Sequence, residues 1–312
     1  MTEHFDIRQD VYEDDDGKWY RCLYACGMDF PFQAAIMDFP FKELRLTESC
    51  LFWVKDTIEM RLASIVSQNQ HTRATPQQQQ QTMPGLSSES WTPFLTRGSD
   101  DGPMILYKAV DQARAASPLN DRGEVQRLEK LSSKAPTELS GDSSRFYFHE
   151  DYQVAEYHAA YMKRRAACEA VAMVRITIPG QIFEDLHESG DLEELCWPEP
   201  EWKEYIWRSK LDKSLPELLQ KYRDALIAAA HIAKGSARLF EMETWEDVPE
   251  SCFFSAGRSM LHPSVHYSFS GRDESREFLE EHGKFEAFDF SDADVQRVRA
   301  REAKRALWRL EE

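Results

Sequence analysis

The pattern of hydrophobic and polar positions is most regular in residues 145–179, which predict a strand, a helix and a second strand. Arg145–Phe148 is a short aromatic run, and Asp151 follows it where a helix N-cap is expected. Val171–Pro179 is rich in β-branched residues and ends at a proline. Between these runs, the following residues recur at helical spacing: Val154, Tyr157, His158, Tyr161 and Met162. We expect the rest of the fold to be arranged around this unit.

The first 66 residues predict a small unit made of a β-hairpin and a helix. Strands are expected at Phe5–Tyr12 and Trp19–Ala25, around a solvated acidic turn at Glu13–Gly17. Thr47–Val66 predicts an amphipathic helix. Its apolar face consists of Leu51, Val54, Ile58, Leu62 and Ile65. A small aromatic core is expected from Phe30, Phe32, Phe39 and Phe41. This unit is either a separate recognition module or a cap on the main domain.

Residues 67–100 have a different composition, with the glutamine run Gln77–Gln81, prolines, and many serines and threonines. Such a segment buries too little apolar surface to offset its ordering entropy. We therefore expect a flexible linker here, between residues 1–66 and a main domain at residues 101–290.

The hydrophobic segments of the main domain predict several more elements. Strands are expected at Met104–Val110, Ala237–Thr244 and Val265–Ser270, and helices near Glu124–Leu131 and at Glu201–Lys210, Ser214–Lys234 and Asp273–His282. The segment Glu184–Pro200 is expected to be irregular. Ser214 and Glu217 have the spacing of a capping box, and Gly235 would end that helix. The fold class expected is α+β, with a mixed, split β-sheet and flanking helices.

The C-terminal residues 291–312 predict one helix that is rich in arginine. Such a helix can bind an anionic partner or act as an import signal. The simpler interpretation is a solvated face that rests on acidic parts of its own domain.

Composition limits the function more than it identifies it. The 312-residue chain is 42% hydrophobic and has a formal net charge of −17, which disfavours general nucleic-acid binding. No apolar run is long enough for a membrane span, and no secretory signal precedes the first elements. The six cysteines form no disulfide framework or zinc spacing, so reduced thiols are expected. We expect a cytoplasmic protein, with the nucleus as the alternative, and neither a metal site nor a membrane partner.

No phosphate-binding loop, dinucleotide fingerprint or hydrolase motif is present. His262 and His266 are four residues apart, but Pro263 disfavours a helical metal pair, and we interpret both as surface or core residues. His149 and His158 are interpreted as structural, although His149 lies just past a strand end, where sites often occur.

Several weaker signals occur in a characteristic order. Leu106-Tyr107-Lys108 ends a strand with a cation, Arg145–Phe148 leads into a helix, and acidic residues follow at Glu241-Met242-Glu243. In this order, over roughly residues 104–290, the chain resembles the ADP-ribosyltransferase fold, including toxin-like and uncharacterised fungal members. The resemblance implies NAD as substrate, with transfer of ADP-ribose to a protein acceptor or hydrolysis of NAD. Such chemistry needs a carboxylate that stabilises an oxocarbenium-like state.

The resemblance also implies roles for individual residues. Lys108, beside Tyr107, would position the ribose or a phosphate of NAD, and Tyr147 or Tyr157 would stack on nicotinamide. The catalytic residue would be Glu243, with Glu241, and Glu201 and Glu204 are the alternative candidates. Lysine replaces the arginine or histidine of the family at position 108, and it lacks the planar fork of arginine. The alternative function is therefore a catalytically inactive member of the fold that acts as a protein-interaction module, and an unrelated α+β protein is the third option.

Overall fold

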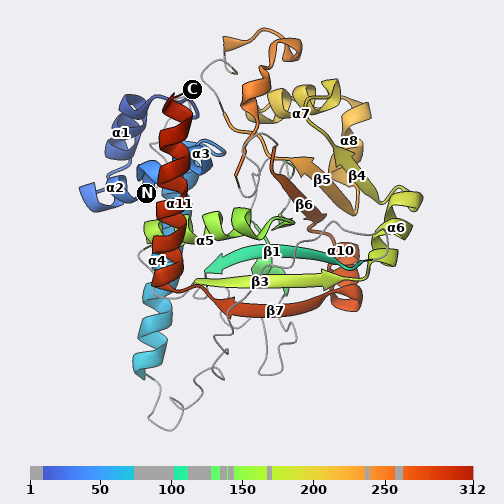
Figure 1. Ribbon diagram of the computed structural model, residues 1–312, viewed down its shortest axis with the longest axis horizontal. Helices are drawn as coiled ribbons and strands as arrows, with labels where there is room; N and C mark the ends of the chain where they lie inside the picture. Colours follow the sequence, from blue (N-terminus) through green and yellow to red (C-terminus); the bar gives the residue numbers. More distant parts are fainter. Residues whose placement is uncertain are drawn as a thin grey trace.

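The computed structural model describes residues 10–73, 102–111, 128–133, 139, 144–166, 171–235, 239, 241–256 and 263–311. These residues form an α+β structure whose seven-stranded mixed sheet has the order β4-β5-β6-β2-β1-β3-β7 (Figure 1). The strands are β1 (Met104–Asp111), β2 (Arg145–His149), β3 (Val171–Ile178), β4 (Leu192–Leu195), β5 (Ile227–His231), β6 (Val265–Ser270) and β7 (Lys284–Asp289). The α-helices are α1 (Asp16–Ala25), α2 (Phe30–Ile36), α3 (Lys42–Arg45), α4 (Cys50–Arg73), α5 (Tyr152–Ala166), α6 (Gly180–Ser189), α7 (Pro200–Lys210), α8 (Glu217–Asp224), α10 (Asp273–His282) and α11 (Asp292–Glu311). Short 3₁₀ helices are η2 (Phe39–Phe41), η3 (Leu128–Leu131), η4 (Trp245–Asp247) and η5 (Glu250–Cys252).

The sheet consists of two halves with a narrow junction. One half is β4-β5-β6-β2 and the other is β1-β3-β7, and within both halves the strands pair over most of their length. Between the halves, β1 and β2 are joined only by the pair Tyr107↔His149. The mixed sheet that the sequence predicts is therefore present. Its antiparallel pairs outnumber the one parallel pair, β4 with β5.

The two faces of the sheet have different coverings. Leu106 of β1 and Phe148 of β2 belong to a core on one face, closed by η3, α6 and α10. On the opposite face, α5 and the N-terminal helices cover β1 and β3, and α7 and α8 cover β4 to β6. The junction of the half-sheets therefore lies where these two helical layers meet.

The predicted N-terminal hairpin is wrong where the structure describes it. The strand expected at Trp19–Ala25 is part of helix α1, and the expected turn supplies its N-cap, with Asp15 accepting from the amide of Lys18. Trp19, Cys22 and Leu23 are buried on one side of α1, so the underlying period is helical. The first part of the expected hairpin, residues 5–9, lies outside the described residues.

The predicted helix at Thr47–Val66 exists as α4, but it begins at Cys50 and continues to Arg73, into the segment expected as linker. Its predicted buried face is only partly correct. Val54 is buried, whereas Ile58, Leu62 and Ile65 are 44%, 57% and 53% exposed. Of the expected phenylalanine core, Phe41 is buried and Phe32 is partly buried against the same cluster, whereas Phe30 and Phe39 are exposed. The glutamine run lies outside the described residues.

In the main domain three expectations are corrected. The helix expected at Ser214–Lys234 ends at Asp224, and Ile227–His231 is strand β5, because this alanine-rich stretch is buried between β4 and β6. Glu184–Pro200, expected to be irregular, contains the end of α6 and all of β4. In the range Ala237–Thr244 the described residues form no strand.

Other expectations are confirmed. The structure contains the three-element unit from β2 to β3, with the Asp151 carboxylate accepting from the amide of Gln153 at 2.8 Å. The strands at Met104–Val110 and Val265–Ser270 and the helices at Glu201–Lys210 and Asp273–His282 are also present. Leu128–Leu131 forms the short η3 where a helix was expected.

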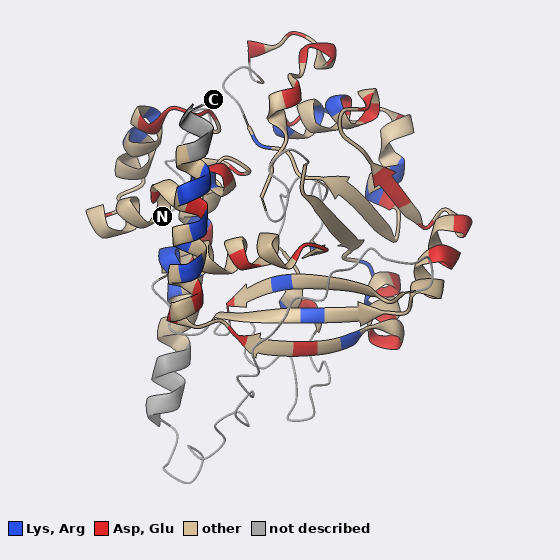
Figure 2. Cartoon of the chain, in the orientation of Figure 1, with Lys and Arg blue, Asp and Glu red and all other residues tan. Residues whose placement is uncertain are grey.

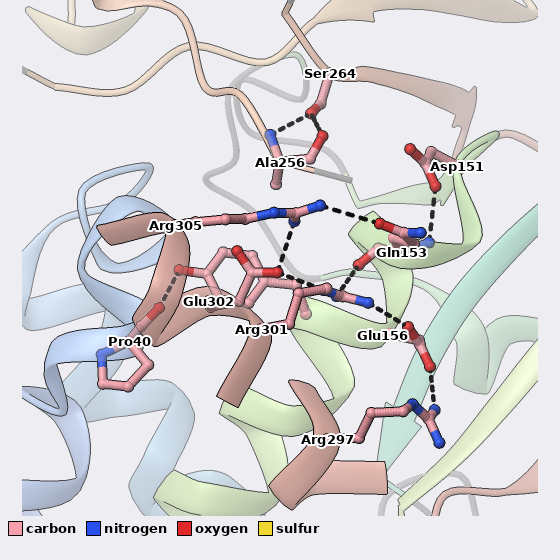
Figure 3. A network of polar contacts seen from close by, with 11 residues as sticks. Pro40, Asp151, Gln153, Glu156, Ala256, Ser264, Arg297, Arg301, Glu302 and Arg305 are labelled. Carbon is pink, nitrogen blue, oxygen red and sulfur yellow. Dashed lines mark hydrogen bonds and ion pairs between the residues drawn. The ribbon is translucent and has the colours of Figure 1, made fainter. Parts of the chain in front are cut away.

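The basic C-terminal helix rests on its own domain. Figure 2 shows basic residues along α11, which lies beside α5 and the N-terminal helices. Glu156 of α5 accepts from Arg297 and Arg301, and Arg301 and Arg305 both contact Glu302 at 2.7 Å (Figure 3). The simpler interpretation of this helix, basic side chains that pair with acidic groups of the same domain, is the one that the structure bears out.

Candidate functional site

The candidate site is the junction of the half-sheets, which we define by Lys108, Tyr147, His149, His158 and His266. Lys108 comes from β1, Tyr147 and His149 from β2, His158 from α5 and His266 from β6. His149 and His266 are paired across β2 and β6, and His149 also takes part in the only β1–β2 pair. Three strands and one helix thus place these side chains at the junction, with Lys108 on one face of the sheet and Tyr147 and the histidines on the other.

Lys108 occupies the side of the junction that faces η3. Its Nζ donates to the Tyr147 carbonyl oxygen at 3.1 Å and to Ser133 Oγ at 3.2 Å, and it lies 6.0 Å from the centre of the Phe148 ring. Among the described residues, no carboxylate lies within ion-pair distance of this ammonium. Burial without a counter-charge lowers the pKa of Lys108 to about 8.

Three histidines form the opposite side of the junction, of which His149 and His266 are buried and His158 is partly buried. The rings of His149 and His158 stack with 4.6 Å between their centres. Burial, and then the charge of Lys108, lower the pKa of His149 to about 3. Burial followed by the neighbouring His149 holds the pKa of His158 and His266 well below its usual range. All three rings are therefore neutral at physiological pH.

Each of these histidines has one buried ring nitrogen without a hydrogen-bond partner in the described structure: His149 Nδ1, His158 Nε2 and His266 Nε2. Buried polar atoms are usually satisfied, so three together are a notable concentration. The junction therefore combines one cation with unsatisfied, uncharged nitrogen atoms.

Four residues that the resemblance predicts to bind NAD do not converge. The side chain of Tyr147 leaves β2 on the face opposite to Phe148, and its ring lies 5.1 Å from that of His266, whereas Lys108 is on the Phe148 face. Tyr107 is buried against the edge of Tyr152.

Tyr157 lies in the core between α5 and the N-terminal helices. Its hydroxyl donates to the Pro40 carbonyl oxygen at 2.7 Å, and its ring stacks on Phe41 and Phe254. This residue has a structural position, at some distance in the fold from the face that carries Lys108.

Glu241 and Glu243, the predicted catalytic pair, are both exposed. They precede η4, which packs against α7 rather than against β1. Their rivals Glu201 and Glu204 lie on α7, where Glu201 accepts from the Tyr222 hydroxyl and Glu204 pairs with Arg208. In the described part of the chain, none of the four has a recorded contact with Lys108.

The histidines of the junction are the residues that sequence reasoning missed as a group. The proximity of His149 and His158 could have been predicted from the sequence. The helix that follows the strand end at His149 returns the chain over the strand, so a residue in its second turn can lie beside that strand end. Nothing in the sequence indicates that His266 pairs with His149, since more than a hundred residues separate them.

Among the described residues, no group of three or more histidine, cysteine or acidic side chains is arranged to hold a metal ion. Within the same part of the chain, no helix is long and apolar enough to cross a membrane. Compared with protein-family models, with curated proteins and with solved structures, the chain matches none of them.

Proposed function

We propose that the junction binds an anionic nucleotide, with NAD as the first candidate, and that Lys108 contacts a phosphate of that ligand. The observation that carries this proposal is the partly buried Lys108 ammonium, which has no ion-pair partner among the described residues. An ammonium removed from water is costly unless an opposite charge approaches it. A phosphate oxygen would supply that charge, and the Ser133 hydroxyl beside Lys108 could donate a second hydrogen bond.

The choice of NAD rests on the resemblance to the ADP-ribosyltransferase fold. Two features support it: the order of β1, β2, α5 and a later strand, and a sheet divided between β1 and β2. The resemblance implies that a cation positions NAD, and Lys108 is a cation at the division of the sheet.

We further propose binding without turnover as the main activity. Transfer or hydrolysis requires a carboxylate next to the developing positive charge. Glu241 and Glu243 are exposed near η4, and the described carboxylates include none that forms an ion pair with Lys108. This arrangement favours the catalytically inactive alternative over an active ADP-ribosyltransferase.

A second candidate function is the protein-interaction role, and a different observation favours it. Ile58, Leu62, Ile65 and Val66 of α4 follow one another along the helix and are between 44% and 57% exposed. Apolar side chains that gather on one helix face commonly bind a partner helix. The two functions are compatible, because α4 and the junction lie on different parts of the molecule (Figure 1).

The proposal is tested by calorimetric titration of the purified protein with NAD, ADP-ribose and nicotinamide. We expect NAD and ADP-ribose to bind and nicotinamide alone not to bind. Lys108→Ala should weaken both by about tenfold or more, since a charged hydrogen bond contributes roughly 1.5–3 kcal/mol. Lys130→Ala removes an exposed lysine of nearby η3 and should change nothing. Equal affinity in Lys108→Ala, or no binding by the wild type, would overturn the proposal.

The pH dependence of binding provides a second measurement. Because the pKa of Lys108 is about 8, NAD affinity should fall as the pH rises through that value. Lys108→Arg stays charged and should lose this dependence. Nicotinamide release, measured in parallel, tests turnover: release that Glu243→Gln or Glu241→Gln abolishes would show an enzyme and refute binding without turnover.

A further inference from the structure

Lys108 is the one charged side chain on its face of strand β1. Side chains alternate along a strand, so Leu106 and Val110 project from β1 on the same side as Lys108. Both belong to the apolar core on that face of the sheet, and so does Val174 of β3, the cross-strand neighbour of Lys108. We call Leu106, Val110 and Val174 the apolar wall, because they flank the base of the Lys108 side chain.

The contacts of Lys108 Nζ are with uncharged groups. Nζ donates to Ser133 Oγ at 3.2 Å and to the Tyr147 carbonyl oxygen at 3.1 Å, and the centre of the Phe148 ring lies 6.0 Å away. Phe148 and η3 belong to the same core as the apolar wall. Within the described part of the chain, no carboxylate forms an ion pair with this nitrogen. The end of the side chain is therefore held by neutral acceptors at the margin of an apolar core.

Such surroundings favour the neutral amine of lysine over the ammonium. An ammonium beside apolar side chains loses hydration, and without a carboxylate it gains no ion pair in return. The pKa of Lys108 is accordingly lowered, by burial, to about 8. At pH 7 roughly a tenth of Lys108 is then neutral amine, compared with less than about 0.1% of a lysine with the ordinary pKa near 10.4. The neutral amine carries the lone pair and is the nucleophilic form of lysine.

The surroundings of the amine also select the class of molecule with which it reacts. Lys108 is partly exposed, whereas its neighbours Leu106 and Val110 are buried, so a small molecule reaches the amine from the solvent side. A molecule that contacts the apolar wall loses less hydration if it is uncharged. Amines form covalent adducts with carbonyl compounds, and the Ser133 hydroxyl, 3.2 Å from Nζ, can donate to a carbonyl oxygen there. An uncharged aldehyde meets all of these conditions.

We propose that Lys108 captures an uncharged aldehyde as an imine. Nζ attacks the carbonyl carbon, the C–N bond forms, and the π electron pair of the C=O bond moves to oxygen, which takes up a proton as Nζ releases one. The carbinolamine then loses water: the C–O bond breaks, Nζ releases its second proton, and the C=N bond forms. One amine and one aldehyde give one imine and one water, with no oxidation or reduction.

This reaction is separate from the proposed nucleotide binding. The nucleotide would be bound by the ammonium form of Lys108, whereas the aldehyde reacts with the neutral amine and needs no nucleotide. The two proposals therefore fail independently, because the reaction is tested in the absence of NAD.

The test is labelling of the folded wild-type protein with benzaldehyde and sodium cyanoborohydride, which reduces an imine to a stable secondary amine. Trypsin does not cleave after an alkylated lysine, so labelled Lys108 appears in the peptide 98–114 instead of 98–108. Lys130, an exposed lysine of nearby η3, is the matched control and is followed in the peptide 128–134. We expect Lys108 to be labelled about tenfold faster than Lys130 at pH 7, or faster still, because its amine fraction is larger. In urea the two lysines should react at equal rates.

The pH dependence and two variants identify the reacting atom. The ratio of the Lys108 rate to the Lys130 rate should fall as the pH rises from 7 toward 10, because Lys130 then loses its proton while Lys108 is already neutral. Lys108→Met suits the apolar wall and Lys108→Arg keeps the charge, and both should lose the fast phase of incorporation in the intact mass. Equal rates at Lys108 and Lys130 in folded wild type would overturn the proposal, as would fast incorporation that survives in folded Lys108→Met.

Discussion

Replacing Glu156 by glutamine should weaken the attachment of α11 to the rest of the molecule. The Glu156 side chain is 4% exposed and accepts from two arginines of α11, Arg297 and Arg301 (Figure 3). Glutamine keeps the shape of glutamate but removes its charge. The substitution therefore leaves two guanidinium groups beside a neutral amide, and one of these, Arg301, is 22% exposed.

The expected loss in the free energy of unfolding follows from the unequal solvent exposure of the two ion pairs that Glu156 forms. Arg301 Nη1 lies 2.8 Å from Glu156 Oε2 in a mostly buried pair, and such a charged hydrogen bond contributes roughly 1.5–3 kcal/mol. Arg297 is 55% exposed, so its pair is screened by solvent and contributes about 0–1 kcal/mol. Arg301 retains its contact with Glu302, which reduces the penalty of an unpaired charge. We expect Glu156→Gln to lower the free energy of unfolding by about 2 kcal/mol.

Urea-induced unfolding, followed by circular dichroism, measures this loss. Glu184→Gln is the matched control, because Glu184 is an exposed glutamate of α6, and it should leave the midpoint unchanged. Hydrogen exchange should show faster exchange in α11 of Glu156→Gln than in the wild type. If the two variants unfold at the same urea concentration, Glu156 does not hold α11 and the account of this network is wrong.

Two further predictions concern the junction and one turn. The junction histidines are neutral in the folded protein and have an ordinary pKa near 6.5 in the unfolded chain. The stability that they contribute above that pH is therefore lost as the pH falls toward the folded pKa, which is about 3 for His149. His149→Gln should flatten the decrease in stability between pH 7 and pH 5, whereas His187→Gln, at an exposed position, should not, and equal pH profiles would refute this role. Gly271→Ala would place a Cβ 2.0 Å from the Ser144 carbonyl oxygen and should destabilise the protein by several kcal/mol. Gly17→Ala, in the first turn of α1, should be neutral or stabilising by about 0.5–1 kcal/mol. Thermal unfolding distinguishes the two variants, and similar midpoints would contradict the predicted clash.

The sequence determined the elements whose pattern is local. Residues 145–179 form a strand, a capped helix and a strand as predicted, because aromatic and β-branched runs and an N-cap act over a few residues. The same holds for the helix at Asp273–His282 and for the basic C-terminal helix. In these segments the local propensity and the tertiary environment favour the same conformation.

Tertiary packing determined the conformation of segments whose local sequence pattern was ambiguous. The alanines of β5 favour a helix by propensity, but the space between β4 and β6 buries them as a strand. Trp19–Ala25 was expected to be a strand, but its buried residues lie on one side of α1, which packs against α4. Burial of apolar area outweighs propensity differences of less than 1 kcal/mol per residue.

The candidate site was decided almost entirely by tertiary structure. The sequence predicted Lys108 as a cation at a strand end, whereas β1 continues past it to Asp111, and it did not predict that its counter-charge would be missing among the described residues. It could not bring His149, His158 and His266 together, because these contacts depend on which strands and helices become neighbours. It also placed Tyr147 and Lys108 in one site, whereas alternation along adjacent strands puts them on opposite faces. Sequence specifies side-chain chemistry and local periodicity, and only packing of the whole chain sets the distances between distant residues.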